Sequence, residues 1–314
     1  SDPMRLGFDV GGTKVLAVVL DDDDPRHPRA VRRAPTGADP AVIIDTVAAL
    51  RGELEEAVGD RAVAVGIGIA GLVDRAGVLH YSPNIGGVTG FAVGRELEQR
   101  LDLRVVVDND ATAATWAEAQ VGAAAGHDHV AMVSLGTGIG VGFVLDGRLY
   151  RGAHGYAGES GHMVVDRNGP RHLTGARGPW ELFASGTAFG VLAREAAAAG
   201  RAPSLVRRAD GAEITDTHID DAVAAGEPDM LDVVDEFADQ VGLGIANLVH
   251  VLDPGVIVIG GGLVGLGDAL IGPIGRATHR HVVGGDHRPP VPVVAAELGA
   301  EAAAIGAALL ADDR

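Results

Sequence analysis

Residues 6–20 read LGFDVGGTKVLAVVL, and residues 130–145 read VAMVSLGTGIGVGFVL. In both stretches an apolar run leads into a glycine turn that contains threonine, and a second apolar run follows. Glycine lets backbone N–H groups turn towards an anion and approach it closely, and threonine adds a hydroxyl donor. A third strand-like run at 256–259 ends in the triglycine Gly260–Gly262. Together the three turns predict a cradle that holds one nucleotide along its length.

The composition limits the function. A chain of 314 residues is long enough for about two domains. Its net charge of −18 argues against nucleic-acid binding, which favours basic patches. The absence of cysteine excludes disulfides and thiolate metal sites. No apolar run reaches the roughly 18 residues of a membrane span, and no signal peptide is evident. We therefore expect a cytoplasmic protein with no membrane partner.

Strand-like and helix-like segments alternate along the chain, as in α/β proteins. The expected strands are 6–10, 15–20, 30–33, 63–70, 105–107, 130–135, 141–145 and 256–259. Helical apolar spacing marks 41–58, 111–120, 180–199 with a break near Ser185-Gly186, 231–251, 268–279 and 301–311. Asp39 and Pro40 predict the N-cap and first residue of the first helix.

The two halves of the chain repeat one theme. The strand, threonine-containing turn and strand of residues 6–20 recur at 130–145, and helices follow each copy. Two such halves predict two similar lobes with a cleft between them. We place a small N-terminal lobe at residues 4–110 together with 300–314, and a large C-terminal lobe at residues 111–299.

Further motifs surround the second turn in a fixed order. Asp108-Asn109-Asp110 precedes it, Gly158-Glu159-Ser160-Gly161-His162 follows it, and Asp253-Pro254 comes shortly before the triglycine. Through this set the chain resembles, from residue 6 to about residue 310, the ROK sugar kinases (repressor, open reading frame, kinase), and among them the bacterial ATP-dependent glucokinases. The resemblance implies an α/β, two-lobed, actin-like or hexokinase-type ATPase fold with a central interlobe cleft. It also implies that the C-terminal helix packs on the first lobe.

MgATP is the implied cofactor. Asp9 ends a strand at the first turn, where its carboxylate is expected to hold Mg²⁺ directly or through water, with a turn aspartate as the alternative. The residues expected to bind the phosphates are Gly11, Gly12, Thr13 and Lys14 in the first turn and Gly136, Thr137 and Gly138 in the second. Gly260, Gly261 and Gly262 would let the nucleoside lie against the backbone, with a tight strand-to-helix turn as the alternative.

Asp110 follows a buried strand and opens a helix. The resemblance implies that it is the general base that takes the proton from the 6-hydroxyl of the sugar, whereas a helix N-cap is the alternative. A helix N-terminus is expected to lower the pKa of Asp110, which a loose phosphoryl-transfer transition state tolerates. The amide of Asn109 offers donors and an acceptor suited to sugar hydroxyls. Asp108 is expected to be structural.

Sugar binding is implied for further residues that match the family's substrate-facing positions in order and spacing. They are Asn84, Glu159, His162 and Glu181. For Glu159 and His162 the alternative is a local hydrogen bond between residues three apart. For Glu181 the alternative is a carboxylate in the first turn of a helix.

The sequence departs from the family at a metal site. Many members bind zinc through the histidine that corresponds to His162 and three cysteines of a later loop. Here those cysteine positions hold His172, Thr174 and Pro179. With His162 and His172 as the only ligands, the set falls short of the four that a structural zinc requires. We expect no structural zinc, and we expect Trp180 to anchor the loop.

These features predict an enzyme, a glucokinase-like sugar kinase of glycolysis that phosphorylates glucose at its 6-hydroxyl with MgATP. One alternative is a kinase for another hexose or amino sugar, such as fructose or N-acetylmannosamine, and another is a glucokinase that uses polyphosphate. A third is a non-catalytic sugar-sensing member of the family. The acidic chain and the few residues before Asp9 disfavour a repressor with a preceding helix-turn-helix. We expect a homodimer or homotetramer.

Overall fold

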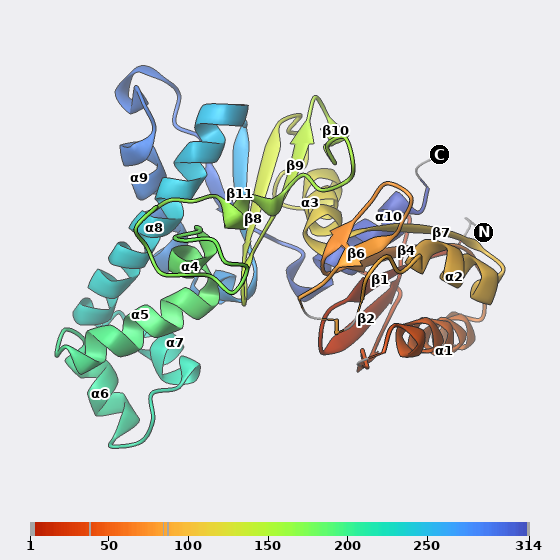
Figure 1. Cartoon of the computed structure of the whole chain (residues 1–314), viewed down its shortest axis with the longest axis horizontal. Coiled ribbons are helices and arrows are strands. Elements are labelled where there is room, and N and C mark those ends of the chain that lie inside the picture. The colour runs from red at the N-terminus through yellow and green to blue at the C-terminus, as the bar shows by residue number, and fades with distance from the viewer. Residues whose placement is uncertain (1–3, 38, 84, 87, 313–314) are drawn as a thin grey trace. The chain divides into compact units, whose positions relative to one another are not determined.

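A computed structural model describes residues 4–37, 39–83, 85–86 and 88–312 (Figure 1). The chain divides into two compact units. The first comprises Ser1–Val130, Gly142–Gly158 and Glu297–Arg314, and the second comprises Ala131–Val141 and Glu159–Ala296. These units divide the chain differently from the predicted lobes, since residues 111–130 and 142–158 belong to the first unit, and the lobes stay a prediction. The helix α3 (Asp110–Val121) packs there against the C-terminal helix α10 (Ala302–Leu310).

The first unit is built on a five-stranded sheet of order β3-β2-β1-β4-β7. Its strands are β1 (Met4–Val10), β2 (Lys14–Val19), β3 (Ala30–Pro35), β4 (Ala62–Ile69) and β7 (Arg104–Asn109). β1 and β2 form the predicted hairpin, whereas β4 and β7 run parallel to β1. Val10 pairs with Ile69, and Ile69 pairs with Asn109. The carboxyl ends of three strands therefore meet at one edge of the sheet.

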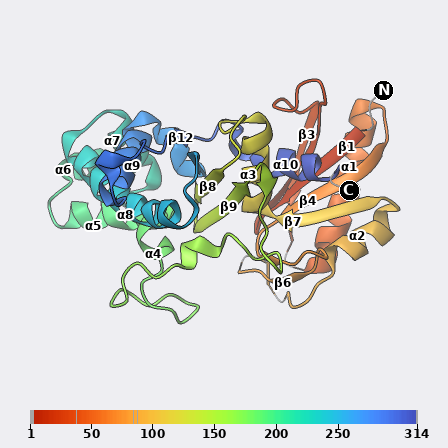
Figure 2. The same cartoon turned by 90° about the horizontal axis from the view of Figure 1, so that it is seen from above.

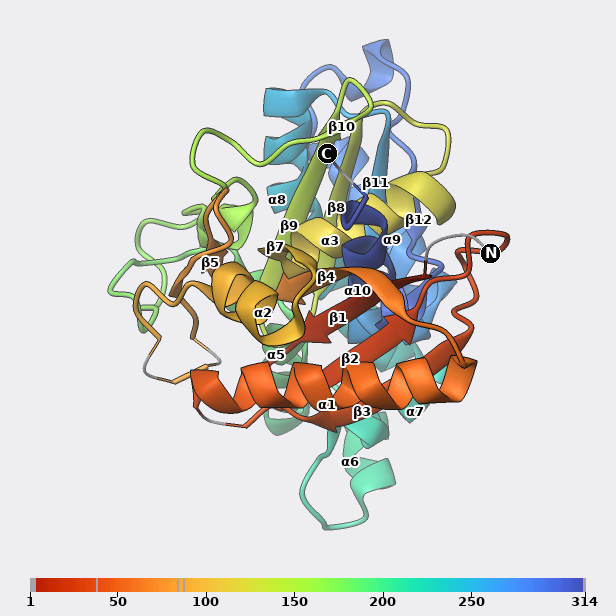
Figure 3. The same ribbon diagram turned by 90° about the vertical axis from the view of Figure 1, so that its right-hand side faces the viewer.

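Helix α1 (Pro40–Val58) covers one face of this sheet (Figure 3). The helix begins as predicted, with Pro40 in its first turn and the Asp39 side chain accepting a hydrogen bond from the N–H of Ala41. Its apolar stripe packs against the alternate residues of β1, β2 and β4 that point to that face. The buried residues of this stripe are Ile43, Val47, Leu50 and Leu54.

Helix α10 covers the opposite face, and glycines let it approach very closely. A Cβ atom at Gly7 would stand 1.8 Å from the carbonyl oxygen of Ala304, and one at Gly66 would stand 1.7 Å from that of Ala307. Only glycine fits at such positions, since any side chain would overlap the helix backbone. The predicted packing of the C-terminal helix on the first part of the fold is confirmed.

The first unit contains one helix that the sequence analysis missed. Helix α2 (Val93–Leu101) buries Val93, Leu97 and Leu101, which are spaced four residues apart on one face. The same spacing can be read in the sequence, but with only three apolar residues it is a weak signal for a helix. The remaining short elements of this unit are β5 (Leu72–Val73), β6 (Leu79–Tyr81), β10 (Arg148–Leu149) and the 3₁₀ helix η4 (Gly299–Glu301).

A second sheet repeats the topology of the first. Its order is β10-β9-β8-β11-β12, so in each sheet the third, second, first, fourth and fifth strands follow one another. The strands new to this sheet are β8 (Val130–Leu135), β9 (Ile139–Leu145), β11 (Val256–Gly260) and β12 (Val293–Ala295). β10 is antiparallel to β9 and β12 is parallel to β11, as in the first sheet. The repeat predicted from residues 6–20 and 130–145 is confirmed at the level of topology.

The second unit also contains helices, among which α8 and α9 lie side by side (Figures 1 and 2). The helices are α4 (Glu181–Ala184), α5 (Gly186–Ala198), α6 (Pro203–Ala209), α7 (Asp216–Ala224), α8 (Pro228–Leu252) and α9 (Asp268–His281), with 3₁₀ helices η1 (Glu159–His162), η2 (Gly262–Leu266) and η3 (Gly285–His287). The predicted break near Ser185-Gly186 is confirmed, because α4 ends at Ala184 and the side chain of Ser185 caps α5. Among the residues that the structure describes, no helix has the length and apolarity needed to span a bilayer.

Candidate active site

The first glycine turn joins β1 to β2 and is held by a residue that the sequence analysis missed. Thr36 is fully buried, its hydroxyl donates to the carbonyl of Gly11 at 2.6 Å, and its N–H donates to the carbonyl of Thr13 at 3.2 Å. The N–H of Gly11 donates to the carbonyl of Lys14 within the turn at 3.1 Å. This N–H is therefore engaged within the turn, and the expected contact of Gly11 with a phosphate stays a prediction. Between described residues, no hydrogen bond uses the N–H groups of Gly12 and Thr13.

Two carboxylates lie near the carboxyl ends of β1 and β7. Burial, assisted by the negative charge of Asp110, raises the pKa of Asp9 to about 7, while Lys14 lowers it in part. Burial also raises the pKa of Asp110, against hydrogen bonds from backbone N–H groups that lower it. The expected lowering of the Asp110 pKa by the helix terminus is wrong, because desolvation outweighs it.

Asn109, and not Asp110, caps helix α3. The side-chain oxygen of Asn109 accepts a hydrogen bond from the N–H of Thr112 at 3.1 Å, and its amide nitrogen donates to the carbonyl of Gly71 at 3.0 Å. Asp110 is the first helical residue, and its carboxylate accepts from the N–H of Ala111 at 2.9 Å. The cap uses the side-chain oxygen of Asn109 and the contact with Gly71 uses one of its two amide N–H bonds, so one N–H remains available. The carboxylate of Asp110 is not needed as the cap.

Asp108 is a buried member of an ion pair. One carboxylate oxygen accepts from Nε of Arg151 at 2.5 Å, and the other accepts from the N–H of Asn109 at 2.9 Å. Burial raises the pKa of Asp108, and the positive charge of Arg151 opposes this. The neighbouring Arg75 donates to the carbonyl of Gly152, the residue after Arg151. These contacts give Asp108 the structural role that was predicted and tie it to the segment that precedes Glu159.

The second glycine turn, between β8 and β9, rests on the N-terminus of α5. The N–H of Gly186 donates to the carbonyl of Gly136 at 2.8 Å, and the hydroxyl of Thr187 donates to the carbonyl of Thr137 at 2.9 Å. The N–H of Gly136 is used within the turn, where it donates to the carbonyl of Gly138. In the described part of the chain, no hydrogen bond uses the N–H groups of Thr137 and Gly138.

The third turn lies against the second. Gly261 has a φ of +86°, and a Cβ there would stand 2.3 Å from the carbonyl oxygen of Leu135. The triglycine thus follows the end of β11 where it meets the end of β8, and it leads through η2 into α9. The alternative, a tight strand-to-helix turn, is present here, whereas the expected contact of the nucleoside with this backbone stays a prediction.

Glu181 is the first residue of α4, and both of its carboxylate oxygens have partners. Oε1 lies 2.9 Å from Nε2 of His172, and Oε2 accepts from the N–H of Ile139 at 3.1 Å. The preceding Trp180 is fully buried against α8, where its indole N–H donates to the carbonyl of Gln240. Trp180 is therefore the predicted anchor of the loop, and it places Glu181 against the second glycine turn.

His162 and Glu159 lie on η1, and a carboxylate oxygen of Glu159 stands 3.7 Å from Nε2 of His162. The two side chains therefore form an ion-pair contact, which is longer than the local hydrogen bond that was the alternative. The ligand atoms of His162, His172 and Glu181 all lie within 4.8 Å of one another. The sequence predicts two potential metal ligands here, His162 and His172, and the structure adds Glu181 as a third.

The structure thus groups the predicted residues within each unit. The first unit brings together Asp9, Gly11, Gly12, Thr13, Lys14, Asn109 and Asp110. The second brings together Gly136, Thr137, Gly138, Glu159, His162, Glu181, Gly260, Gly261 and Gly262. Asn84 lies outside the described residues.

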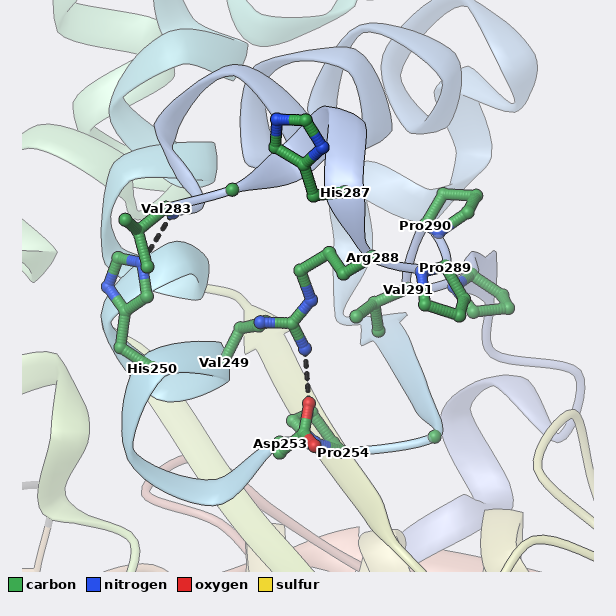
Figure 4. Close-up of a pocket in the computed structure, with 13 residues that line it drawn as sticks. Val249, His250, Asp253, Pro254, Val283, His287, Arg288, Pro289, Pro290 and Val291 are labelled. Atoms are coloured by element: carbon green, nitrogen blue, oxygen red, sulfur yellow. Dashed lines mark hydrogen bonds and ion pairs between the residues drawn. The ribbon is translucent and has the colours of Figure 1, made fainter.

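A cavity of about 730 Å³ lies elsewhere in the second unit, between the ends of α8 and α9 (Figure 4). Arg288 points across it to Asp253, and Nε2 of His250 accepts from the N–H of Val283 at 2.9 Å. Pro254 and Gly255 place this cavity at the amino end of β11, whereas ligands of α/β sheets bind at carboxyl ends. None of the predicted site residues lines it.

Comparison with known proteins agrees with this geometry. Residues 5–314 match the ROK family, and the chain belongs to that family. The glucokinase of Streptomyces coelicolor is 38% identical over 98% of this chain and 97% of its own length. That of Thermotoga maritima is 33% identical over 98% of this chain and 97% of its own length.

A solved structure shares the whole fold. The crystal structure of a ROK family glucokinase from Streptomyces griseus, in complex with glucose and AMPPNP, matches with a TM-score of 0.87 and 36% identity. The match covers 99% of this chain and 100% of the other. The predicted α/β, actin-like, hexokinase-type fold is confirmed.

Proposed function

We propose that this sugar kinase transfers the γ-phosphoryl group of ATP to the 6-hydroxyl of glucose. The observation that carries the proposal is Asp110, a carboxylate released from capping by Asn109 and given a raised pKa by burial. A general base acts best when its pKa lies towards the working pH. The glucokinases of similar sequence, and the related structure that holds glucose and AMPPNP, support glucose and ATP as the substrates.

In the proposed reaction Asp110 accepts the proton of the 6-hydroxyl while that oxygen bonds to the γ-phosphorus. The bond from the γ-phosphorus to the oxygen that bridges it to the β-phosphate breaks, and ADP leaves. Such a transition state is loose, so positioning of the reactants contributes more than early proton removal. Asn109 holds the first turn of α3 and the carbonyl of Gly71, and it thereby fixes the backbone from which Asp110 projects.

Mg²⁺ fits the residues of the first unit. Asp9 and Asp110 are two partly buried carboxylates whose mutual repulsion contributes to the raised pKa of Asp9, and a divalent cation would relieve it. Asp9 would hold the ion directly or through water, and the ion would neutralise phosphate charge. The N–H groups of Gly12 and Thr13 and the Lys14 ammonium would bind the phosphates from the same turn.

Residues of the second unit would supply the other contacts. The N–H groups of Thr137 and Gly138 are proposed to bind phosphate, and the triglycine at 260–262 would let the nucleoside lie against the backbone. Glu159, His162 and Glu181 are proposed to bind sugar hydroxyls. An ionised carboxylate accepts directed hydrogen bonds and an imidazole can donate or accept one, so together these groups discriminate hydroxyl positions.

A coupled assay of ADP release across a panel of sugars tests the proposal. We expect turnover with glucose and MgATP, loss of turnover with EDTA, and little turnover with polyphosphate. A faster reaction with fructose, N-acetylmannosamine or polyphosphate would replace the substrate or donor in the proposal. Glucose binding without turnover of any sugar would indicate a sugar-sensing protein instead. Sedimentation of the same sample would test the expected homodimer or homotetramer.

A further inference from the structure

The loop that carries zinc ligands in many relatives is held here by a histidine. His172 lies in the loop before α4, and its side chain is 9% exposed. The N–H of His172 donates to the carbonyl of Ala176 at 2.8 Å, and the N–H of Gly175 donates to the carbonyl of His172 at 2.9 Å. The loop thus closes on itself and directs the imidazole inward, to within 2.9 Å of Oε1 of Glu181.

The hydrogen bonds of Thr174 define which nitrogen of His172 carries the proton. The backbone N–H of Thr174 points at Nδ1 of His172 at 3.2 Å, and the hydroxyl of Thr174 lies 2.7 Å from the same nitrogen. A backbone N–H can only donate, so Nδ1 must be an acceptor without a proton. In neutral imidazole the proton then sits on Nε2, which faces Glu181.

The carboxylate of Glu181 is held from both sides. Nε2 of His172 lies 2.9 Å from Oε1, and the N–H of Ile139, at the end of the second glycine turn, donates to Oε2. A Cβ at Gly138 would stand 2.4 Å from Oε2, so the turn itself blocks movement on that side. A hydrogen bond to an ionised group is stronger than one between neutral groups. Glu181 is therefore fixed before any sugar arrives.

We propose that His172, oriented by Thr174, is a positioning residue that holds Glu181 for sugar binding and does so without a metal ion. The proposal rests on the proposed function, since it takes Glu181 as a sugar-binding carboxylate. In place of a metal ion, His172 offers Glu181 a directed N–H donor. In place of a second metal ligand, Thr174 makes the contacts that select the tautomer of His172.

The same tautomer argues against a metal site at His162, His172 and Glu181. A metal ion needs the lone pair of Nε2, which would move the proton to Nδ1 and set it against the N–H of Thr174. The rings of His162 and His172 have centroids 5.4 Å apart, and the side chain of His162 is 43% exposed. Two imidazoles and one carboxylate already engaged with Ile139 form an incomplete set for structural zinc.

Ring ¹⁵N NMR tests the tautomer without any assay of activity. The chain has 12 histidines, and the His172 signals are assigned by their loss in His172→Gln. We expect a protonated Nε2 and an unprotonated Nδ1, both unchanged when Zn²⁺ is added. A protonated Nδ1, or Zn²⁺ binding that shifts the ring signals of His162 and His172 together, would overturn the proposal in favour of a metal site.

Kinetics and calorimetry with glucose test the positioning role. His172→Ala should raise the glucose KM and Kd by about 10- to 100-fold, the range for a lost hydrogen bond to a charged group, with a smaller change in kcat. His172→Gln should recover much of the affinity, because its amide can donate from a similar place. Thr174→Val should weaken glucose binding less than His172→Ala, and Thr174→Ser should resemble the wild type.

Leu173→Ala is the matched control, since Leu173 lies in the same loop and is 85% exposed. Glucose affinities of His172→Ala and Leu173→Ala that agree within error would disprove the positioning role, provided both melt like the wild type. Should His172→Ala fail to fold, Thr174→Val and His172→Gln decide the question in the same way. A wild type that phosphorylates no sugar refutes the proposed function, whereas the NMR result still decides whether His172 donates to Glu181.

Discussion

The two threonine-containing glycine turns are similar in sequence but are supported and charged differently. The turn after β1 is held by one buried hydroxyl, that of Thr36, and it ends a strand that carries Asp9. The turn after β8 is held by the N-terminus of α5, and Ser134 stands where Asp9 stands in the first. One glycine pattern thus supports two kinds of site. The first turn lies beside the ionisable groups to which we ascribe the proposed proton and metal chemistry, and the second offers neutral N–H donors.

The largest expected effect is that of Asp110→Asn in the first unit. It should lower kcat by about 10²- to 10⁴-fold, the usual contribution of a general acid–base group, with little change in glucose Kd. Asn109 provides the cap of α3, so the mutant should keep the wild-type melting temperature. Steady-state kinetics and calorimetry would check this. Near-normal kcat in a folded mutant would remove Asp110 from the catalytic role.

Alanine substitutions in the two turns should have unequal effects. A Cβ at Gly138 would stand 2.4 Å from Oε2 of Glu181, whereas one at Gly11 would stand 3.4 Å from the carbonyl oxygen of Lys14. Gly138→Ala must displace either the turn or the carboxylate, and a misplacement of about 1 Å costs up to about 10²-fold in rate. We expect kcat/KM for glucose to fall much further in Gly138→Ala than in Gly11→Ala. Equal losses would mean that Glu181 does not depend on this contact.

These contacts show what the sequence could and could not predict. The hairpins, the repeat and the capped start of α1 follow from local patterns, and all are confirmed. Thr36 and Thr187 support turns from 25 and 50 residues away, so no local signal could reveal them. The raised pKa of Asp110 was missed for a related reason. The terminus of α3 is visible in the sequence, but the burial that outweighs it is produced by tertiary packing.

The first glycine turn lies beside ionisable groups, so we predict a pH-dependent effect on stability at Asp9. Its pKa is about 7 in the folded protein, above the ordinary value of 3.8, so folding favours the protonated form. The stability contributed by this group is full below about pH 4 and is lost as the pH rises towards 7. Asp9→Asn cannot ionise, so its melting temperature without Mg²⁺ should exceed that of the wild type by a margin that grows from pH 5 to 7 and then levels off.

Melting curves from pH 5 to 8, with and without Mg²⁺, measure that margin. Mg²⁺ should stabilise the wild type at pH 8 more than the mutant, because it binds the ionised carboxylate. No comparable pH dependence is expected for Ser134→Ala at the matching position of the second unit. A margin that is constant with pH would show that Asp9 does not titrate in this range.

The smallest effects concern the two supporting hydroxyls, which make the same kind of bond in different surroundings. The Thr36 hydroxyl is fully buried and donates at 2.6 Å, whereas Thr187 is exposed and donates at 2.9 Å. Valine keeps the shape of each side chain and removes the donor. Thr36→Val leaves the carbonyl of Gly11 without that donor and should cost about 1–2 kcal/mol of stability. At Thr187 water can replace the lost hydroxyl, so Thr187→Val should stay within about 0.5 kcal/mol of the wild type.

Urea unfolding of both variants would measure the difference in their free energies of unfolding. Equal costs would mean that the two turns are supported alike, and that the contrast between them lies in their charges alone.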